Sequence, residues 1–188
     1  MTKDCIALIG FMGTGKTTVG QALVDYLGKD FKFIETDQII IEMAGKPIPR
    51  IFSEDGEEKF RVYEIEACKK VSKLKKVVIS CGGGVVLNNI NINNLKKNCY
   101  VVLLTASPKE IYKRVVNEGK ELRPVIDKDD PMSEIEKILK HRENFYYSSA
   151  DIVVDTSGKS IEKVISNIIS KITKLGKFNF LLKHKRVE

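Results

Sequence analysis

The sequence has few of the residues that several kinds of catalytic or metal site require. Its 188 residues include no Trp, four Cys without C-x-x-C spacing, and two His, His141 and His184. Two histidines leave no basis for a Ser-His-Asp triad or for a metal cage built on imidazole. Any metal ion should therefore be Mg²⁺ on oxygen ligands.

The chain also shows no secretory signal pattern and no apolar run long enough to cross a membrane. The scattered cysteines fit a reducing compartment, where thiols act as small apolar side chains. We therefore expect a cytoplasmic protein with no membrane partner.

Positive charge exceeds negative charge by +7, and residues 175–188 alone contribute +3 of this excess. We expect residues 1–174 to form one domain, because this length with 43% hydrophobic residues supports a single core. Residues 175–188 would be a basic tail. A nucleic-acid or membrane binder driven by this tail is disfavoured, because the tail is short and its charge is modest. We expect no nucleic-acid partner.

A phosphate-binding motif follows the first apolar run. In "IALIGFMGTGKTTVG", Gly10, Gly15, Lys16 and Thr17 occupy the fixed positions of G-x-x-x-x-G-K-[ST]. Glycines allow the backbone N–H groups to wrap closely around an anion. Apolar residues at helical spacing follow up to Gly28, so a helix should begin at this loop and point its positive end at the phosphates. We call residues 10–17 the P-loop.

Short apolar runs alternate with helical patterns along the chain. The runs cover residues 6–9, 33–34, 77–79, 100–104 and 152–154, and the clearest helical patterns cover residues 16–27, 57–74, 108–117, 133–144 and 160–172. This alternation predicts a three-layer α/β/α domain with a parallel sheet of about five strands. Ligands in such folds bind beyond the carboxyl ends of the strands.

Polar and glycine residues follow the predicted strands at this edge. Glu35 and Asp37 follow the second strand, and the triple glycine, Gly82, Gly83 and Gly84, follows the third.

At this point the sequence resembles the shikimate kinases, a family of P-loop enzymes similar to nucleoside monophosphate kinases. The resemblance rests on "GFMGTGKTTVG", "ETDQIIIE", "IFSEDGEEKFRVYE", "CGGGVV" and "LRPVI", and it covers about residues 6–156. It implies a P-loop kinase fold with a mobile lid at about residues 117–131 and a substrate-binding helical region at about residues 37–74. The implied reaction takes ATP and shikimate, needs Mg²⁺, and belongs to aromatic amino-acid biosynthesis. We expect a monomer.

The resemblance also assigns roles to single residues. The residues expected at the nucleotide are Gly13, Thr14, Gly15, Lys16, Thr17, Thr18 and Arg114, the last of these flanking the adenine with residues 156–160. The residues expected at shikimate are Asp37, Arg61, Gly82, Gly83, Gly84 and Arg142, with the two arginines on its carboxylate. The residues expected to be catalytic are Lys16, Asp37 and Arg123, the last carried by the lid. Thr17 and Glu35 are expected at the metal, although many relatives have Asp where this chain has Glu35.

The chemistry of these residue types agrees with the assignment. Phosphoryl transfer depends on positioning and on charge neutralisation, which lysine, arginine and Mg²⁺ supply. A planar, two-pronged arginine suits a carboxylate better than lysine does.

Alternatives are another small-molecule P-loop kinase, such as a gluconate kinase, and a catalytically silent relative that binds a partner. The triple glycine and the paired arginines disfavour the first alternative, and the joint presence of Lys16, Thr17, Asp37 and Arg123 disfavours the second. Arg61 and Glu64, three residues apart, could also be an ordinary surface ion pair.

Overall fold

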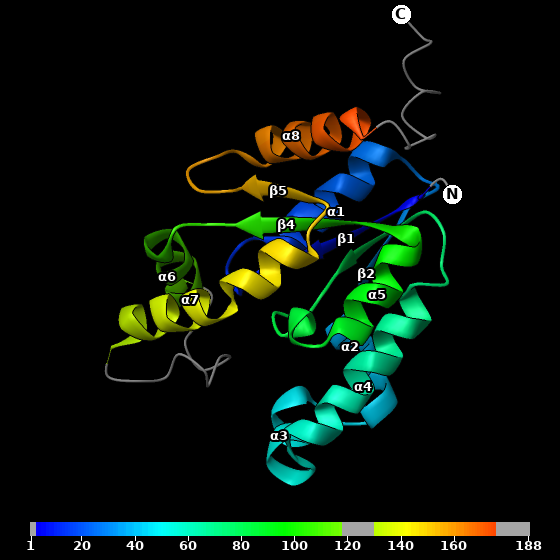
Figure 1. Cartoon of the computed structure of the whole chain (residues 1–188). Helices are drawn as coiled ribbons and strands as arrows, with labels where there is room; N and C mark the ends of the chain where they lie inside the picture. Colours follow the sequence, from blue (N-terminus) through cyan, green and yellow to red (C-terminus); the bar gives the residue numbers. More distant parts are fainter. Residues whose placement is uncertain (1–2, 118–129, 176–188) are drawn as a thin grey trace, which may run out of the picture.

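A computed structural model describes residues 3–117 and 130–175 of the chain. Figure 1 shows a central sheet with helices on both faces. Within the described residues, the sheet has five parallel strands in the order β2-β3-β1-β4-β5. The strands are β1 (Cys5–Ile9), β2 (Lys32–Glu35), β3 (Val77–Ser80), β4 (Cys99–Thr105) and β5 (Ile152–Asp155). The predicted fold class is confirmed.

The helices cover more of the chain than the sequence pattern indicated. They are α1 (Lys16–Leu27), α2 (Thr36–Ala44), α3 (Ile48–Glu54), α4 (Gly56–Val71), α5 (Asn89–Asn98), α6 (Pro108–Asn117), α7 (Pro131–Ser149) and α8 (Ile161–Lys174), with a 3₁₀ turn at Val85–Leu87. The predicted bounds of α1 and α6 are correct. Helices α2 and α3 lie in the helical region that the resemblance implies at about residues 37–74, whereas α5 was not predicted, and α7 extends five residues beyond its predicted end.

Alternate residues of the central strands enter two different cores. In β1, Ala7 packs with the layer that includes α4, α5 and α7, whereas Leu8 packs with α1 and α8. All five residues of β1 are buried, as expected for a strand that is covered on both faces. The prediction of buried strands is wrong for β2, because β2 lies at the sheet edge and its residues are only partly buried or exposed.

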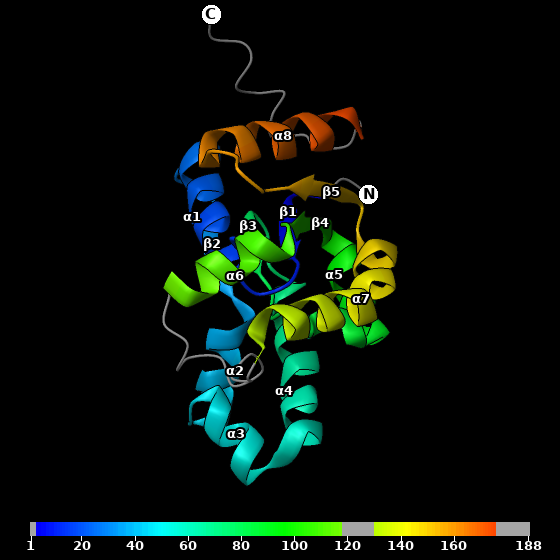
Figure 2. The same cartoon turned by 90° about the vertical axis from the view of Figure 1, so that its left-hand side faces the viewer.

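The carboxyl ends of the strands point to one side of the molecule, which faces the viewer in Figure 2. Helices α6 and α7 lie across this side, and α2, α3 and α4 lie below it. Among the described residues, no helix is long and apolar enough to cross a membrane. Most of the predicted lid and nearly all of the predicted tail lie outside the described residues.

Candidate active site

The P-loop connects β1 to α1 and needs glycine where the motif places it. Gly10, Gly13 and Gly15 all have positive φ angles, of 144°, 70° and 89°, which side chains disfavour. A Cβ atom on Gly10 would also lie 2.3 Å from the carbonyl oxygen of Leu104 in the neighbouring strand. The loop can therefore take this path only with glycine at these positions.

The P-loop folds around the side chain of Lys16. The ammonium donates hydrogen bonds to the carbonyl oxygens of Gly10 (3.0 Å) and Phe11 (2.9 Å). Thr14 is buried, and its hydroxyl donates to the same carbonyl of Phe11 at 2.8 Å. Helix α1 begins at Lys16, and Thr17 and Thr18 are exposed in its first turn. The arrangement gathers a cation and a helix N-terminus, the two elements that favour a bound phosphate.

The two residues expected at a metal ion touch each other. The Thr17 hydroxyl donates a 2.7 Å hydrogen bond to the carboxylate of Glu35, which is the last residue of β2. In the described part of the chain, no group of three or more His, Cys, Asp or Glu side chains could hold a metal ion by itself. The pair fits Mg²⁺, which takes oxygen ligands and usually combines one or two protein groups with water and phosphate oxygens.

The triple glycine leaves room for two of the predicted substrate residues. A Cβ atom on Gly82 would lie 2.6 Å from Oδ1 of Asp37, and a Cβ atom on Gly84 would lie 2.6 Å from Nη1 of Arg61. The N–H group of Gly82 donates to the hydroxyl of Thr36 at 3.0 Å, which ties the glycines to the start of α2. Glycine at these positions therefore allows the carboxylate and the guanidinium to approach the backbone closely.

Arg61 is held by carboxylates of its own helix, α4. Its guanidinium donates to Glu57 (2.8 Å) and to Glu64 (3.0 Å). Glu64 is 1% exposed and also accepts a 3.2 Å hydrogen bond from the amide of Asn91 in α5. Arg61 and Glu64 do form the ion pair that their spacing predicts, but the pair is not an ordinary surface one, because Glu64 is buried. Burial raises the pKa of Glu64 above its ordinary value, although the attraction of Arg61 opposes this shift.

Helix α7 brings Arg142 and Tyr146 to the triple glycine. Arg142 Nη1 lies 3.4 Å from the carbonyl oxygen of Gly83, and the Tyr146 hydroxyl donates to the same oxygen at 2.6 Å. Burial raises the pKa of Tyr146 to about 12, so this hydroxyl keeps its proton. Tyr146 was not among the predicted site residues. Its position four residues after Arg142, and so on the same face of a helix, was an available signal.

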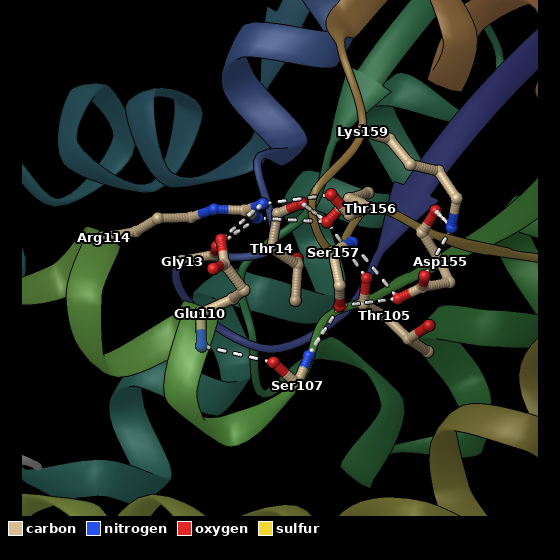
Figure 3. Close-up of polar contacts among 10 residues, drawn as sticks. All are labelled: Gly13, Thr14, Thr105, Ser107, Glu110, Arg114, Asp155, Thr156, Ser157 and Lys159. Carbon is tan, nitrogen blue, oxygen red and sulfur yellow. Dashed lines mark hydrogen bonds and ion pairs between the residues drawn. The ribbon is translucent and has the colours of Figure 1, made fainter.

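Arg114 reaches from α6 to the P-loop at Gly13, as Figure 3 shows. Its guanidinium donates to the carbonyl oxygens of Gly13 and Thr156, both at 3.1 Å. This position is next to residues 156–160, the segment expected beside the adenine. Arg123, the predicted lid arginine, lies outside the described residues.

A cavity of about 280 Å³ lies between the end of β4 and α7. Thr14 and Tyr146 line it, but Asp37, Arg61 and the triple glycine do not. We therefore do not place the substrate there.

Comparison with known proteins gives the family of this chain. The family model of shikimate kinase matches residues 12–173. The shikimate kinase of Caldanaerobacter subterraneus subsp. tengcongensis is 45% identical over 170 residues, which cover 90% of this chain and 96% of that protein. The shikimate kinase of Pelotomaculum thermopropionicum is 40% identical over 183 residues, covering 97% of this chain and 98% of that protein.

Solved structures give the same result. The shikimate kinase from Acinetobacter baumannii in complex with shikimate has a TM-score of 0.82 and 27% identity, and the match covers 100% of this chain and 97% of that one. A gluconokinase from Sinorhizobium meliloti has a TM-score of 0.58 at 13% identity, with 93% and 95% covered. That likeness shows the shared fold alone. The matched family model and the relatives show, in agreement with the geometry of the site, that this chain belongs to the shikimate kinase family.

Proposed function

We propose that this protein transfers the γ-phosphoryl group of ATP to the 3-hydroxyl of shikimate, within aromatic amino-acid biosynthesis. The observation that carries the proposal is the meeting of Asp37, Arg61 and Arg142 at the triple glycine. This meeting places the carboxylate of Asp37 and two cations around a single tripeptide beside the P-loop, where the carboxylate of Glu64 is paired with Arg61. A hydroxylated carboxylic acid has the groups to match them.

In the proposed reaction, Arg61 and Arg142 bind the carboxylate of shikimate, and the ring lies against the triple glycine. Glu57 and Glu64 hold the Arg61 guanidinium in one orientation before the substrate arrives, which reduces the entropy lost on binding. Asp37 is in the first turn of α2. There it orients the attacking hydroxyl and can accept its proton.

Lys16 and the N-terminus of α1 neutralise the phosphate charge that the reaction redistributes. Thr17 and Glu35 would hold Mg²⁺, which would supply further charge neutralisation for the phosphates. Arg114 would contact the adenine of ATP. Its N–H groups bond to protein carbonyls. The flat face of the guanidinium is therefore the part that can stack on the adenine ring.

A coupled ADP-release assay tests the proposal. Shikimate, quinate, gluconate and a nucleoside monophosphate are compared as acceptors with Mg²⁺ and ATP, and Asp37→Asn serves as the inactive control. We expect turnover with shikimate that requires Mg²⁺ and Asp37. Clear activity on another acceptor, with none on shikimate, would contradict the proposal.

The proposal also includes a monomeric enzyme in the cytoplasm. The support for a reducing compartment is that all four cysteines are buried free thiols. Size-exclusion chromatography with light scattering measures the oligomeric state.

A further inference from the structure

Thr156 lies where three elements of the nucleotide side meet. It directly follows β5 and is 4% exposed. Its hydroxyl oxygen lies 3.0 Å from Arg114 Nη1, 3.2 Å from the carbonyl oxygen of Thr14 and 3.0 Å from that of Thr105 (Figure 3). A hydroxyl can accept from the guanidinium while it donates its single proton to one carbonyl at a time. One side chain therefore links α6, the P-loop and the end of β4.

Arg114 provides a second link between α6, the P-loop and the residue that follows β5. Its guanidinium donates to Gly13 of the P-loop at 3.1 Å and to the backbone oxygen of Thr156 at 3.1 Å. Glu110, one turn earlier on α6, lies 3.6 Å from Nη2 and balances the charge. The backbone N–H group of Thr156 also donates to Thr105 at 2.8 Å, which fixes where the hydroxyl sits.

These links hold P-loop carbonyl groups, and they thereby orient P-loop N–H groups. The C=O and N–H of one trans peptide unit point in opposite directions. Holding the Thr14 carbonyl therefore directs the N–H group of Gly15 away from Thr156. Gly13 and Gly15 have positive φ angles. Because glycine adopts other backbone angles almost as easily, the loop needs contacts from outside it to keep one conformation.

We propose that Thr156 is a positioning residue for ATP. Its hydroxyl holds the P-loop carbonyl of Thr14 and the guanidinium of Arg114, which in turn binds the carbonyl of Gly13, in the arrangement that receives the phosphates and the base. This inference rests on the proposed function, since it assigns a role within the same nucleotide site. It predicts that the loss of this hydroxyl weakens nucleotide binding and leaves shikimate binding nearly intact, because Asp37 and Arg61 contact the triple glycine on another part of the sheet edge.

Thr156→Val removes the hydroxyl and keeps the shape of the side chain, and Thr156→Ser keeps the hydroxyl. Thr173→Val is the matched control, because the Thr173 hydroxyl bonds to a backbone carbonyl within α8, away from the site. ADP binding is measured by calorimetry, and KM for ATP, KM for shikimate and kcat are measured by the coupled assay. Thermal unfolding shows whether each variant folds.

We expect Thr156→Val to weaken ADP binding and to raise KM for ATP by about tenfold or more, since hydrogen bonds to charged groups are the stronger ones. KM for shikimate should change by less than about twofold. Thr156→Ser should recover most of the nucleotide affinity, and Thr173→Val should behave as the unmodified protein does.

Unchanged ADP affinity in Thr156→Val, an equal loss of affinity for both substrates, or failure of Thr156→Ser to recover the affinity would each overturn the inference. If Thr156→Val does not fold, Thr156→Ala and Thr156→Ser provide the same comparison. Calorimetry with ADP needs no acceptor, so a failure of the proposed function, seen as no turnover of shikimate by the unmodified protein, is distinguished from a failure of this inference.

Discussion

Replacing the glycines of the triple glycine one at a time should separate two steps of the reaction. A methyl group on Gly82 would lie 2.6 Å from Oδ1 of Asp37. A methyl group on Gly84 would lie 2.6 Å from Nη1, 3.1 Å from Nη2 and 3.2 Å from Cζ of Arg61. Neither glycine has a positive φ angle, so alanine adds no backbone strain at either position.

The distance that the Asp37 or Arg61 side chain must move determines the size of the kinetic defect. Ordinary contact with a Cβ atom begins at 3.4 Å, so Asp37 Oδ1 or Arg61 Nη1 must move by about 0.8 Å. Asp37 Oδ1 is at the end of a flexible side chain, so it can move at little cost to the fold, whereas Arg61 Nη1 can move only by disturbing its ion pair with the buried Glu64. A misplacement of about 1 Å at the reacting groups can cost about 100-fold in rate. Gly82→Ala should therefore lower kcat by about 100-fold, with a small change in unfolding temperature.

Gly84→Ala should act chiefly on substrate affinity, because it turns the guanidinium that is proposed to bind the carboxylate of shikimate. The loss of a charged hydrogen bond, about 1.5–3 kcal/mol, corresponds to a rise in KM for shikimate of about 10- to 100-fold. Affinity for ADP should stay the same in both variants. Steady-state kinetics with each substrate varied in turn separates the two defects.

Gly83→Ala is the matched control for folding and for ADP binding, since the nearest atoms to its Cβ would lie 3.8–3.9 Å away. The reasoning is refuted if Gly82→Ala and Gly84→Ala give the same kinetic defect, or if both mainly weaken ATP binding. In either case the glycines would act through the fold of the loop and not through Asp37 and Arg61.

Three further predictions follow from the contacts in the site. Lys16→Ala should lower kcat by about 100-fold or more in a protein that still folds, because it removes a phosphate-neutralising charge; a near-normal rate would show that the P-loop is not the catalytic nucleotide site. Asp37→Asn should nearly abolish turnover, whereas Glu35→Asp should keep kcat within about tenfold, or about 1.4 kcal/mol, because water can bridge a shortened carboxylate; equal damage would make Glu35 a direct participant. Burial raises the pKa of Glu64 in the folded protein, so its contribution to stability is fully present below the unfolded pKa and is lost as the pH rises through the folded pKa. The stability of the unmodified protein relative to Glu64→Gln, measured by urea unfolding, should therefore be greater at about pH 4 than at about pH 8, and the opposite trend would contradict a raised pKa.

The sequence by itself determined the features that depend on neighbouring residues. The bounds of α1 were predictable because glycines with positive φ angles stand at both of its ends, at Gly15 and Gly28. The parallel sheet was predictable because short apolar runs alternate with helical patterns along the chain. Strands that are connected by helices in this way are parallel and are buried on both faces of the sheet. The P-loop, Asp37 and the triple glycine could be predicted to lie at one edge of the sheet, since each closely follows a parallel strand.

Tertiary contacts decided the rest. Helix α5, "NININNLKKN", is rich in Asn, which has low helix propensity; it is a helix because Ile92 and Leu95 pack into the core. Glu64 and Asn91 meet across 27 positions of sequence, and Thr156 meets Thr14 across 142. No local pattern encodes such pairs, because the order β3-β1-β4-β5 decides which strand ends, and so which side chains, become neighbours. The local chain therefore set the backbone path of the P-loop, while packing set the partners that hold it in place.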